Sequence, residues 1–145
     1  MHFSCVIGAE GPRHNVLVGI TSGHRSALKV AGRPVPQPVS TTLLIDTGAS
    51  STLICESVIR KLDLTPRGFT LMHSPTTGGL PMQVPQYDVD LIITNPKGAS
   101  ETIANLLVMT RDMSSLDIDG LLGRDVLARS RMTYSGPENI LLLSF

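Results

Sequence analysis

The chain has 145 residues, with 12 basic and 12 acidic side chains. This length predicts a single domain over residues 1–145, and the balanced charge leaves no basic surface for nucleic acid. The apolar stretches are far shorter than the ~18 residues of a membrane span. The first residues lack a signal-peptide pattern, so we expect a cytoplasmic protein that does not contact a membrane.

Short strands separated by turn-forming residues predict an all-β domain. The chain contains 13 glycines and 10 prolines among short apolar or β-branched runs. Residues 16–20 and 39–45 are such runs and predict strands. Between them, residues 21–38 hold several glycines and prolines and predict a loop or ragged hairpin. The strand over 39–45 leads into a tight turn at Asp46.

The second half of the chain continues this pattern. Apolar residues at helical spacing predict a short helix or helical turn over 54–62. Residues 70–73 and 84–93 predict a β-hairpin, because the connection over 74–81 is dense in turn formers. The remaining expected elements are a strand over 104–109, a short helix over 124–129, a turn over 134–138 and a terminal strand over 140–145.

The cysteines and histidines do not form a recognisable metal site. Cys5 and Cys55 are widely separated, which predicts two buried, reduced thiols. The four histidines form neither a His-Glu-x-x-His nor a His-x-His pattern. We therefore expect neither a metal ion nor another cofactor.

Two motifs carry the chemical information in this sequence. In the first, an apolar run delivers Asp46 into the turn Asp46-Thr47-Gly48, followed by Ala49-Ser50-Ser51. A carboxylate on such a turn is typical of acid-base machinery, although Asp often only accepts backbone N–H bonds there. The second motif, residues 118–127, places two leucines and Gly123 before the predicted short helix.

Together the two motifs resemble those of aspartic peptidases of the single-lobed retropepsin type. The resemblance covers about residues 16–145 and implies a closed β-domain with a flap hairpin, a short C-terminal helix and a terminal strand used in dimerisation. It assigns the catalytic position to Asp46, a lock between the two subunits to Thr47, and a backbone contact with substrate to Gly48. The substrate-binding residues that it implies are Ala49, Ser50, Thr77, Gly78, Gly79 and Leu122, with residues 74–81 as the flap.

The resemblance has one departure. Many viral relatives have Asp at the position of Ser50, where it pairs with the arginine that follows the late glycine, here Arg124. Ser50 cannot form this ion pair, so Arg124 is expected either to bind another acid, such as Asp125, or to be exposed. The Ser50-Ser51 pair is similar to the cellular branch of the superfamily.

The chemistry implied by the resemblance requires two carboxylates, whereas the chain carries one Asp-Thr-Gly string. We therefore expect a homodimer in which two Asp46 residues face each other across the two-fold axis and share a proton. The apolar tail over 140–145 would leave an exposed strand edge on a monomer, which also favours dimerisation. The expected partners are a second copy and a peptide or protein substrate.

Two other functions remain open. The domain would be a dimerisation or peptide-binding module if it had kept the Asp46 turn but cleaved little or nothing. The third hypothesis is an unrelated hydrolase that uses Asp46 with His73 or Ser50, but the sequence has neither a Gly-x-Ser-x-Gly elbow nor an evident triad.

Overall fold

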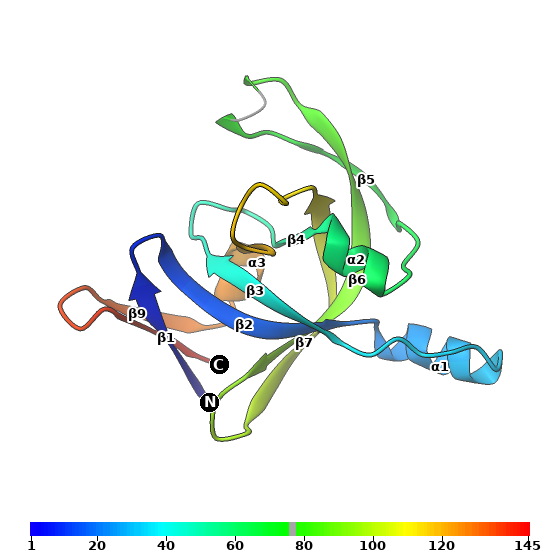
Figure 1. Ribbon diagram of the computed structural model, residues 1–145, viewed down its shortest axis with the longest axis horizontal. Helices are drawn as coiled ribbons and strands as arrows, with labels where there is room; N and C mark the ends of the chain where they lie inside the picture. The colour runs from blue at the N-terminus through cyan, green and yellow to red at the C-terminus, as the bar shows by residue number, and fades with distance from the viewer. Residues whose placement is uncertain (76–77) are drawn as a thin grey trace.

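The computed structural model describes residues 1–75 and 78–145. The described residues form strands joined by short connections and a few short helices (Figure 1). The helices are α1 (Ser22–Val30), α2 (Glu56–Lys61) and α3 (Arg124–Leu127). The strands are β1 (His2–Gly8), β2 (Gly11–Gly19), β3 (Val39–Ile45), β4 (Leu53–Cys55), β5 (Gly68–Met72), β6 (Met82–Thr94), β7 (Ser100–Arg111), β8 (Gly120–Leu122), β9 (Arg131–Ser135) and β10 (Ile140–Ser144).

The sheet closes on itself to form a barrel. Its strand order is β5-β6-β7-β4-β8-β3-β2-β1-β10-β9, and β6 pairs in addition with β2. That second pairing closes a ring of β2, β6, β7, β4, β8 and β3, while β5 and the β1-β10-β9 sheet extend from it. The prediction of an all-β, closed domain is confirmed.

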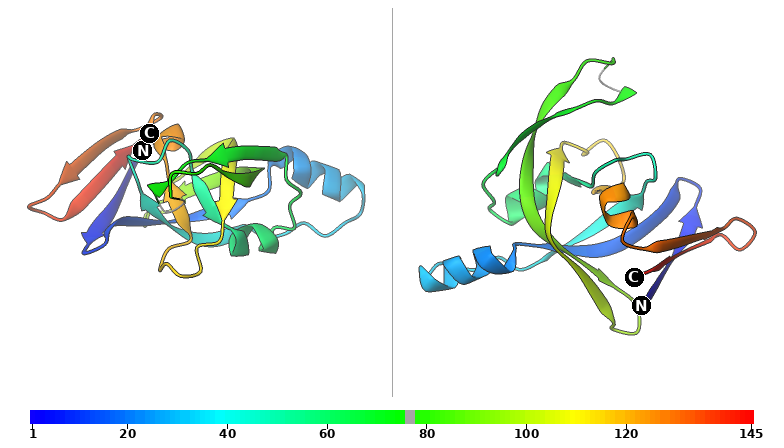
Figure 2. Two further views of the ribbon diagram at one scale, coloured as in Figure 1. Left: turned by 90° about the horizontal axis from the view of Figure 1, so that it is seen from above. Right: turned by 180° about the vertical axis from the view of Figure 1, so that it is seen from behind.

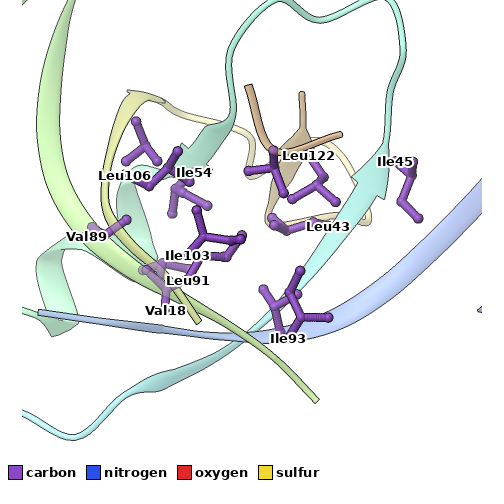
Figure 3. Close-up of a cluster of buried hydrophobic side chains, with 14 of the residues drawn as sticks. Val18, Leu43, Ile45, Ile54, Val89, Leu91, Ile93, Ile103, Leu106 and Leu122 are labelled. Atoms are coloured by element: carbon purple, nitrogen blue, oxygen red, sulfur yellow. The ribbon is translucent and has the colours of Figure 1, made fainter. Parts of the chain in front are cut away.

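The barrel interior is filled by aliphatic side chains from every strand of the ring (Figure 3). Val89, Leu91 and Ile93 of β6 are fully buried, whereas the residues between them are partly exposed. The buried and exposed residues alternate because neighbouring side chains of a strand point to opposite faces. The free thiols Cys5 and Cys55 are also buried, as predicted.

The segment before β3 differs from its prediction. Residues 21–38 were expected to form a loop or ragged hairpin, but α1 occupies half of them and projects from the barrel (Figure 2). The Thr21 side chain accepts a hydrogen bond from the His24 backbone N–H at 3.3 Å and so caps the helix. The prolines of this segment all follow the helix, at positions 34, 36 and 38, where they cannot interrupt it.

The terminal strands also differ from the prediction. β1 was not expected, and Tyr134 lies within β9 rather than in a turn, which falls instead between β9 and β10. β10 is paired on both sides, with β1 and with β9. The expectation that the tail over 140–145 leaves an exposed strand edge is therefore wrong, because that edge belongs to β9.

The other predicted elements are confirmed with shifted ends. The helix expected over 54–62 is α2, the helix expected over 124–129 is α3, and the β5–β6 hairpin lies where its two strands were predicted. β7 is longer than the strand expected over 104–109. None of the helices over the described residues is long and apolar enough to span a bilayer.

Candidate active site

The Asp46 turn, residues 46–51, follows β3 directly. The Asp46 backbone N–H donates to the Leu122 carbonyl at 3.0 Å, and Ala49 N–H donates to the Asp46 carbonyl at 3.2 Å. The Gly48 N–H donates to Asp46 Oδ1 at 2.8 Å, so the turn fixes the direction of the carboxylate. A Cβ at position 48 would lie 3.1 Å from Asp46 Oδ1, which explains why glycine suits this close approach.

β8 and Gly123, the residue that follows it, pack directly against the backbone of residues 51–53, which continue from the Asp46 turn. A Cβ on Gly120 would lie 2.0 Å from the Leu53 carbonyl oxygen, and a Cβ on Gly123 would lie 2.5 Å from the Ser51 carbonyl carbon. Real Cβ atoms do not approach other atoms so closely, so both positions exclude any side chain. Glycine at these two positions therefore allows β8 to pack closely against the backbone that continues from the turn.

A hydrogen-bond network joins the turn to α3. Both oxygens of the Asp125 carboxylate bind Thr52: Oδ2 accepts from the Thr52 backbone N–H at 2.9 Å, and Oδ1 accepts from its hydroxyl at 2.7 Å. Thr52 Oγ1 in turn accepts from the Gly123 N–H at 3.2 Å. Sequence reasoning missed this pair, because the two residues are 73 positions apart and neither lies in a recognised local pattern.

Arg124 acts on the turn directly. Its Nη1 donates to the Thr47 carbonyl at 2.8 Å, and its backbone N–H donates to the Ala49 carbonyl at 2.9 Å. Arg124 therefore binds a backbone carbonyl and not Asp125, the acid suggested as its partner. Asp125 binds Thr52 instead. The arginine holds the turn without a carboxylate at position 50.

A groove of about 550 Å³ opens between the turn and the β5–β6 hairpin. Among the described residues, Asp46 is the one carboxylate that lines it. A larger groove, of about 680 Å³, lies between α1 and the segment after α2 and includes no residue of the Asp46 turn. The residues that line the first groove are Asp46, Gly48, Ala49, Ser50, Ser51, Leu53, residues 70–75, Gln86, Met109 and Leu121.

The structure brings four of the predicted site residues together in this groove: Asp46, Gly48, Ala49 and Ser50. Leu122 does not fit its predicted contact with substrate, because it is 1% exposed and packs inside the barrel (Figure 3). Its neighbour Leu121 points the other way and lines the groove, as adjacent strand residues must.

Three further predicted residues, Thr47, Gly78 and Gly79, are described by the structure but do not line the groove. Thr47 is exposed beside the groove. Gly78 and Gly79, in the connection of the β5–β6 hairpin, are exposed and have φ of +65° and +79°, conformations that glycine adopts readily. Thr77 lies outside the described residues.

The site can perform acid-base chemistry with one carboxylate. Asp46 is half-buried, directed by Gly48, and open to a groove that Leu53, Met109 and Leu121 help to line. Among the described residues, no group of three or more His, Cys, Asp or Glu side chains gathers in a metal-binding arrangement. A single carboxylate can serve as acid or as base, but hydrolysis of an amide needs both roles at once.

Comparison with known proteins agrees with this geometry. The model of a family described as aspartyl protease matches residues 27–126, more than half of the chain. A retropepsin-like aspartic protease from Rickettsia conorii has a similar structure, with a TM-score of 0.58 and 16% sequence identity, over 99% of this chain and 89% of that one. No curated protein sequence matches the chain. The chain belongs to the aspartyl protease family and has a retropepsin-like fold.

Proposed function

We propose that the protein is an aspartic endopeptidase whose active site forms between two copies, each of which supplies one Asp46. The observation that carries the proposal is the lone, directed carboxylate of Asp46 at the edge of an open groove. Thr47 and Gly48 are exposed next to it, so the turn is free to meet a second copy. In this arrangement the Thr47 hydroxyl bonds to the partner's turn.

The two carboxylates share one proton, because two negative charges at such a distance repel each other. The ionised carboxylate takes a proton from water, and the water oxygen attacks the peptide carbonyl carbon. The protonated carboxylate meanwhile gives its proton to the carbonyl oxygen. The carboxyl group that took the water proton then gives it to the nitrogen as the C–N bond breaks. The other carboxylate takes a proton from one hydroxyl of the tetrahedral intermediate, which releases a carboxylic acid and an amine and restores the singly protonated pair.

The groove favours an extended peptide with apolar side chains next to the cut. Leu53, Met72, Met109 and Leu121 supply apolar walls. The β5–β6 hairpin lines one side of the groove and would act as the flap, with Gly78 and Gly79 in its connection. The cytoplasmic location and the absence of nucleic-acid and membrane partners stay predictions from the sequence.

Cleavage of a diverse peptide mixture between about pH 4 and 7.5, with cut sites identified by mass spectrometry, tests this function. Asp46→Asn keeps the shape of the turn but cannot act as a base, so we expect the cuts to disappear, a loss of at least about 1,000-fold. Asp63→Asn is the matched control: Asp63 is exposed, and its φ of 51° is one that Asn adopts readily.

Two outcomes would contradict the proposal. Cuts that persist in Asp46→Asn would show that another group performs the chemistry. If the folded wild-type protein bound peptides without cutting any of them at any pH, the domain would instead be a peptide-binding module.

A further inference from the structure

The groove of about 680 Å³ between α1 and the connection from α2 to β5 forms a second candidate binding site, the helix groove. α1 and this connection lie on the same side of the barrel (Figures 1 and 2). Leu28, Val35 and Leu64 supply apolar surface to the groove. Its volume falls within the ~300–1,000 Å³ of ligand-binding pockets, so it has room for several residues of a peptide.

The backbone on both sides of the helix groove is outside the sheet. Residues 34–38, after α1, and residues 64–66, after α2, belong to no strand or helix. Their carbonyl groups are therefore outside any ladder of hydrogen bonds. A peptide that lies extended in the groove can bond to them, much as an added strand bonds to a sheet edge.

The α1 side of the helix groove is basic. Residues 21–38 contain Arg25, Lys29 and Arg33 and no Asp or Glu. The whole chain has equal numbers of basic and acidic residues, so the rest of it carries an excess of acid. Arg33 lines the groove, is exposed, and forms no salt bridge with a described residue.

The two carboxylates that line the helix groove leave this positive charge in place. Asp88 is paired, because its Oδ1 atom lies 3.0 Å from Arg67 Nη1. Asp63 is exposed and belongs to the opposite side, next to α2. The α1 side is therefore suited to an acidic ligand.

The helix groove continues the groove beside Asp46 along β6. Gln86 lines the groove beside Asp46, and Asp88 lines the helix groove. The two residues are two positions apart on one strand, so their side chains share a face and their Cα atoms are about 7 Å apart. Arg67 joins them, because its backbone N–H donates to the Gln86 carbonyl at 2.8 Å and its side chain binds Asp88. A peptide that follows β6 out of the first groove enters the second.

We propose that the helix groove is a second docking site, which binds an acidic segment of the protein substrate at a distance from the cut. This inference rests on the proposed function, because that function places the cut at Asp46. A two-fold axis between two Asp46 residues gives the assembled site one helix groove towards each end of a bound peptide. Arg33 binds acidic side chains of the segment, while Leu28, Val35 and Leu64 contact apolar side chains between them.

Peptides with different tails test this preference. Each carries the same cleavable core and a tail of alternating Glu and Val, of alternating Lys and Val, or of Gly and Ser. Gly-Ser spacers of about two, five and eight residues ensure that one spacing spans the two grooves. We expect the Glu-Val tail to raise kcat/KM at least about tenfold over the Gly-Ser tail through a lower KM, because the tail binds away from the reacting atoms.

Reversal of one charge tests the role of Arg33. Arg33→Glu should remove the gain from the Glu-Val tail without changing cleavage of the core with the Gly-Ser tail. Lys97→Glu is the matched control, because Lys97 is exposed in the turn between β6 and β7 and does not line the helix groove. Asp63→Asn removes a negative charge from the opposite side and should not weaken the gain. Circular dichroism verifies that the variants are folded.

A binding measurement separates this inference from the proposed function. The fluorescently labelled Glu-Val tail, without a core, should bind to Asp46→Asn protein, and adding Arg33→Glu should weaken this binding at least about tenfold. If this binding is observed but the wild type cleaves no peptide, the docking site is supported and the proposed function is contradicted. Cleavage that depends on Asp46 but is equal for all tails overturns the docking site alone, as does a gain that Arg33→Glu retains.

Discussion

The two walls of the groove are built in opposite ways. The wall that carries Asp46 is held by close backbone contacts at Gly120 and Gly123 and by the Asp125 carboxylate. The facing wall, the β5–β6 hairpin, leaves Leu71 60% exposed and Leu80 73% exposed. The first wall has no space for an added atom at Gly120 or Gly123, whereas the second has side chains that are largely exposed.

This difference matches what peptide hydrolysis requires of each wall. A catalytic carboxylate must be held in place, because a shift of about 1 Å can reduce the rate by roughly 100-fold. A cover that admits and releases a peptide must instead move without disturbing the core. We therefore expect substitutions in the Asp46 wall to alter stability and rate together, and substitutions at hairpin positions with open space around them to leave stability nearly unchanged.

The largest effect on stability is expected from substituting a glycine in the Asp46 wall. Gly120→Ala places a Cβ 2.0 Å from the Leu53 carbonyl oxygen and 2.8 Å from Leu43 Cδ2, so β8 and β4 must separate. Overpacking of this kind should lower the free energy of unfolding by about 3 kcal/mol or more, measured by urea denaturation. Gly68→Ala, in β5, is the matched hairpin variant, because a Cβ there meets nothing within 4 Å.

Gly68→Ala should change stability by less than about 1 kcal/mol. Equal losses in the two variants would show that the walls do not differ in the way proposed.

The next effect concerns Asp125. Asp125→Ala leaves the buried Thr52 N–H without its acceptor, and Thr52 is 0% exposed. An unsatisfied buried donor should lower stability by about 2 kcal/mol. The same change releases the segment that follows Asp46, so kcat should fall by more than about tenfold, with a smaller change in KM.

Asp125→Asn provides the control for this role. Its amide oxygen can accept from the Thr52 N–H and its amide nitrogen can donate to the Thr52 hydroxyl, so we expect partial recovery of both stability and kcat. If Asp125→Ala lost stability but kept the wild-type kcat, Asp125 would stabilise the fold without positioning Asp46.

The features that the sequence could predict are those formed by residues close together in the chain. β3 and β6 were predicted correctly because their buried residues alternate with more exposed ones, next to clear turn signals. The Asp46 turn was found because its residues are consecutive. Thr52 and Asp125 could not be paired from the sequence, because their contact depends on how β4 and α3 meet in space.

The errors have similar physical causes. α1 was missed because Gly23 and the prolines after residue 33 suggested a loop, whereas the capping hydroxyl of Thr21 is a weaker signal. β9 was read partly as a turn because Gly136 and Pro137 follow it closely. Leu122 was assigned to the groove from the resemblance alone. A short strand does not reveal which of its faces is buried, and a shift of one residue exchanges the two faces.

The smallest expected effect is a dependence of the free energy of unfolding on pH, which arises from His14, next to the strand that carries Asp46. His14 of β2 pairs with Leu43 of β3, the strand that leads to Asp46. Its ring packs edge to face on Phe3, and its Nε2 atom is buried without a hydrogen-bond partner among the described residues. Burial lowers the pKa of His14 below its ordinary value, and a hydrogen bond with the Thr94 backbone opposes this only in part.

The unfolded chain therefore takes up a proton at His14 as the pH falls through about 6.5, while the folded protein does not until its lower pKa is reached. With respect to His14, the free energy of unfolding should be highest above about pH 6.5 and should decrease as the pH falls from there toward the pKa of His14 in the folded protein. His14→Gln removes this titration, so the stability of the wild type relative to the variant should decrease between about pH 7.5 and 5, measured by urea denaturation. A constant difference would show that His14 titrates alike in both states. Because His14 pairs with the strand that leads to Asp46, acidification should weaken the wall that holds Asp46.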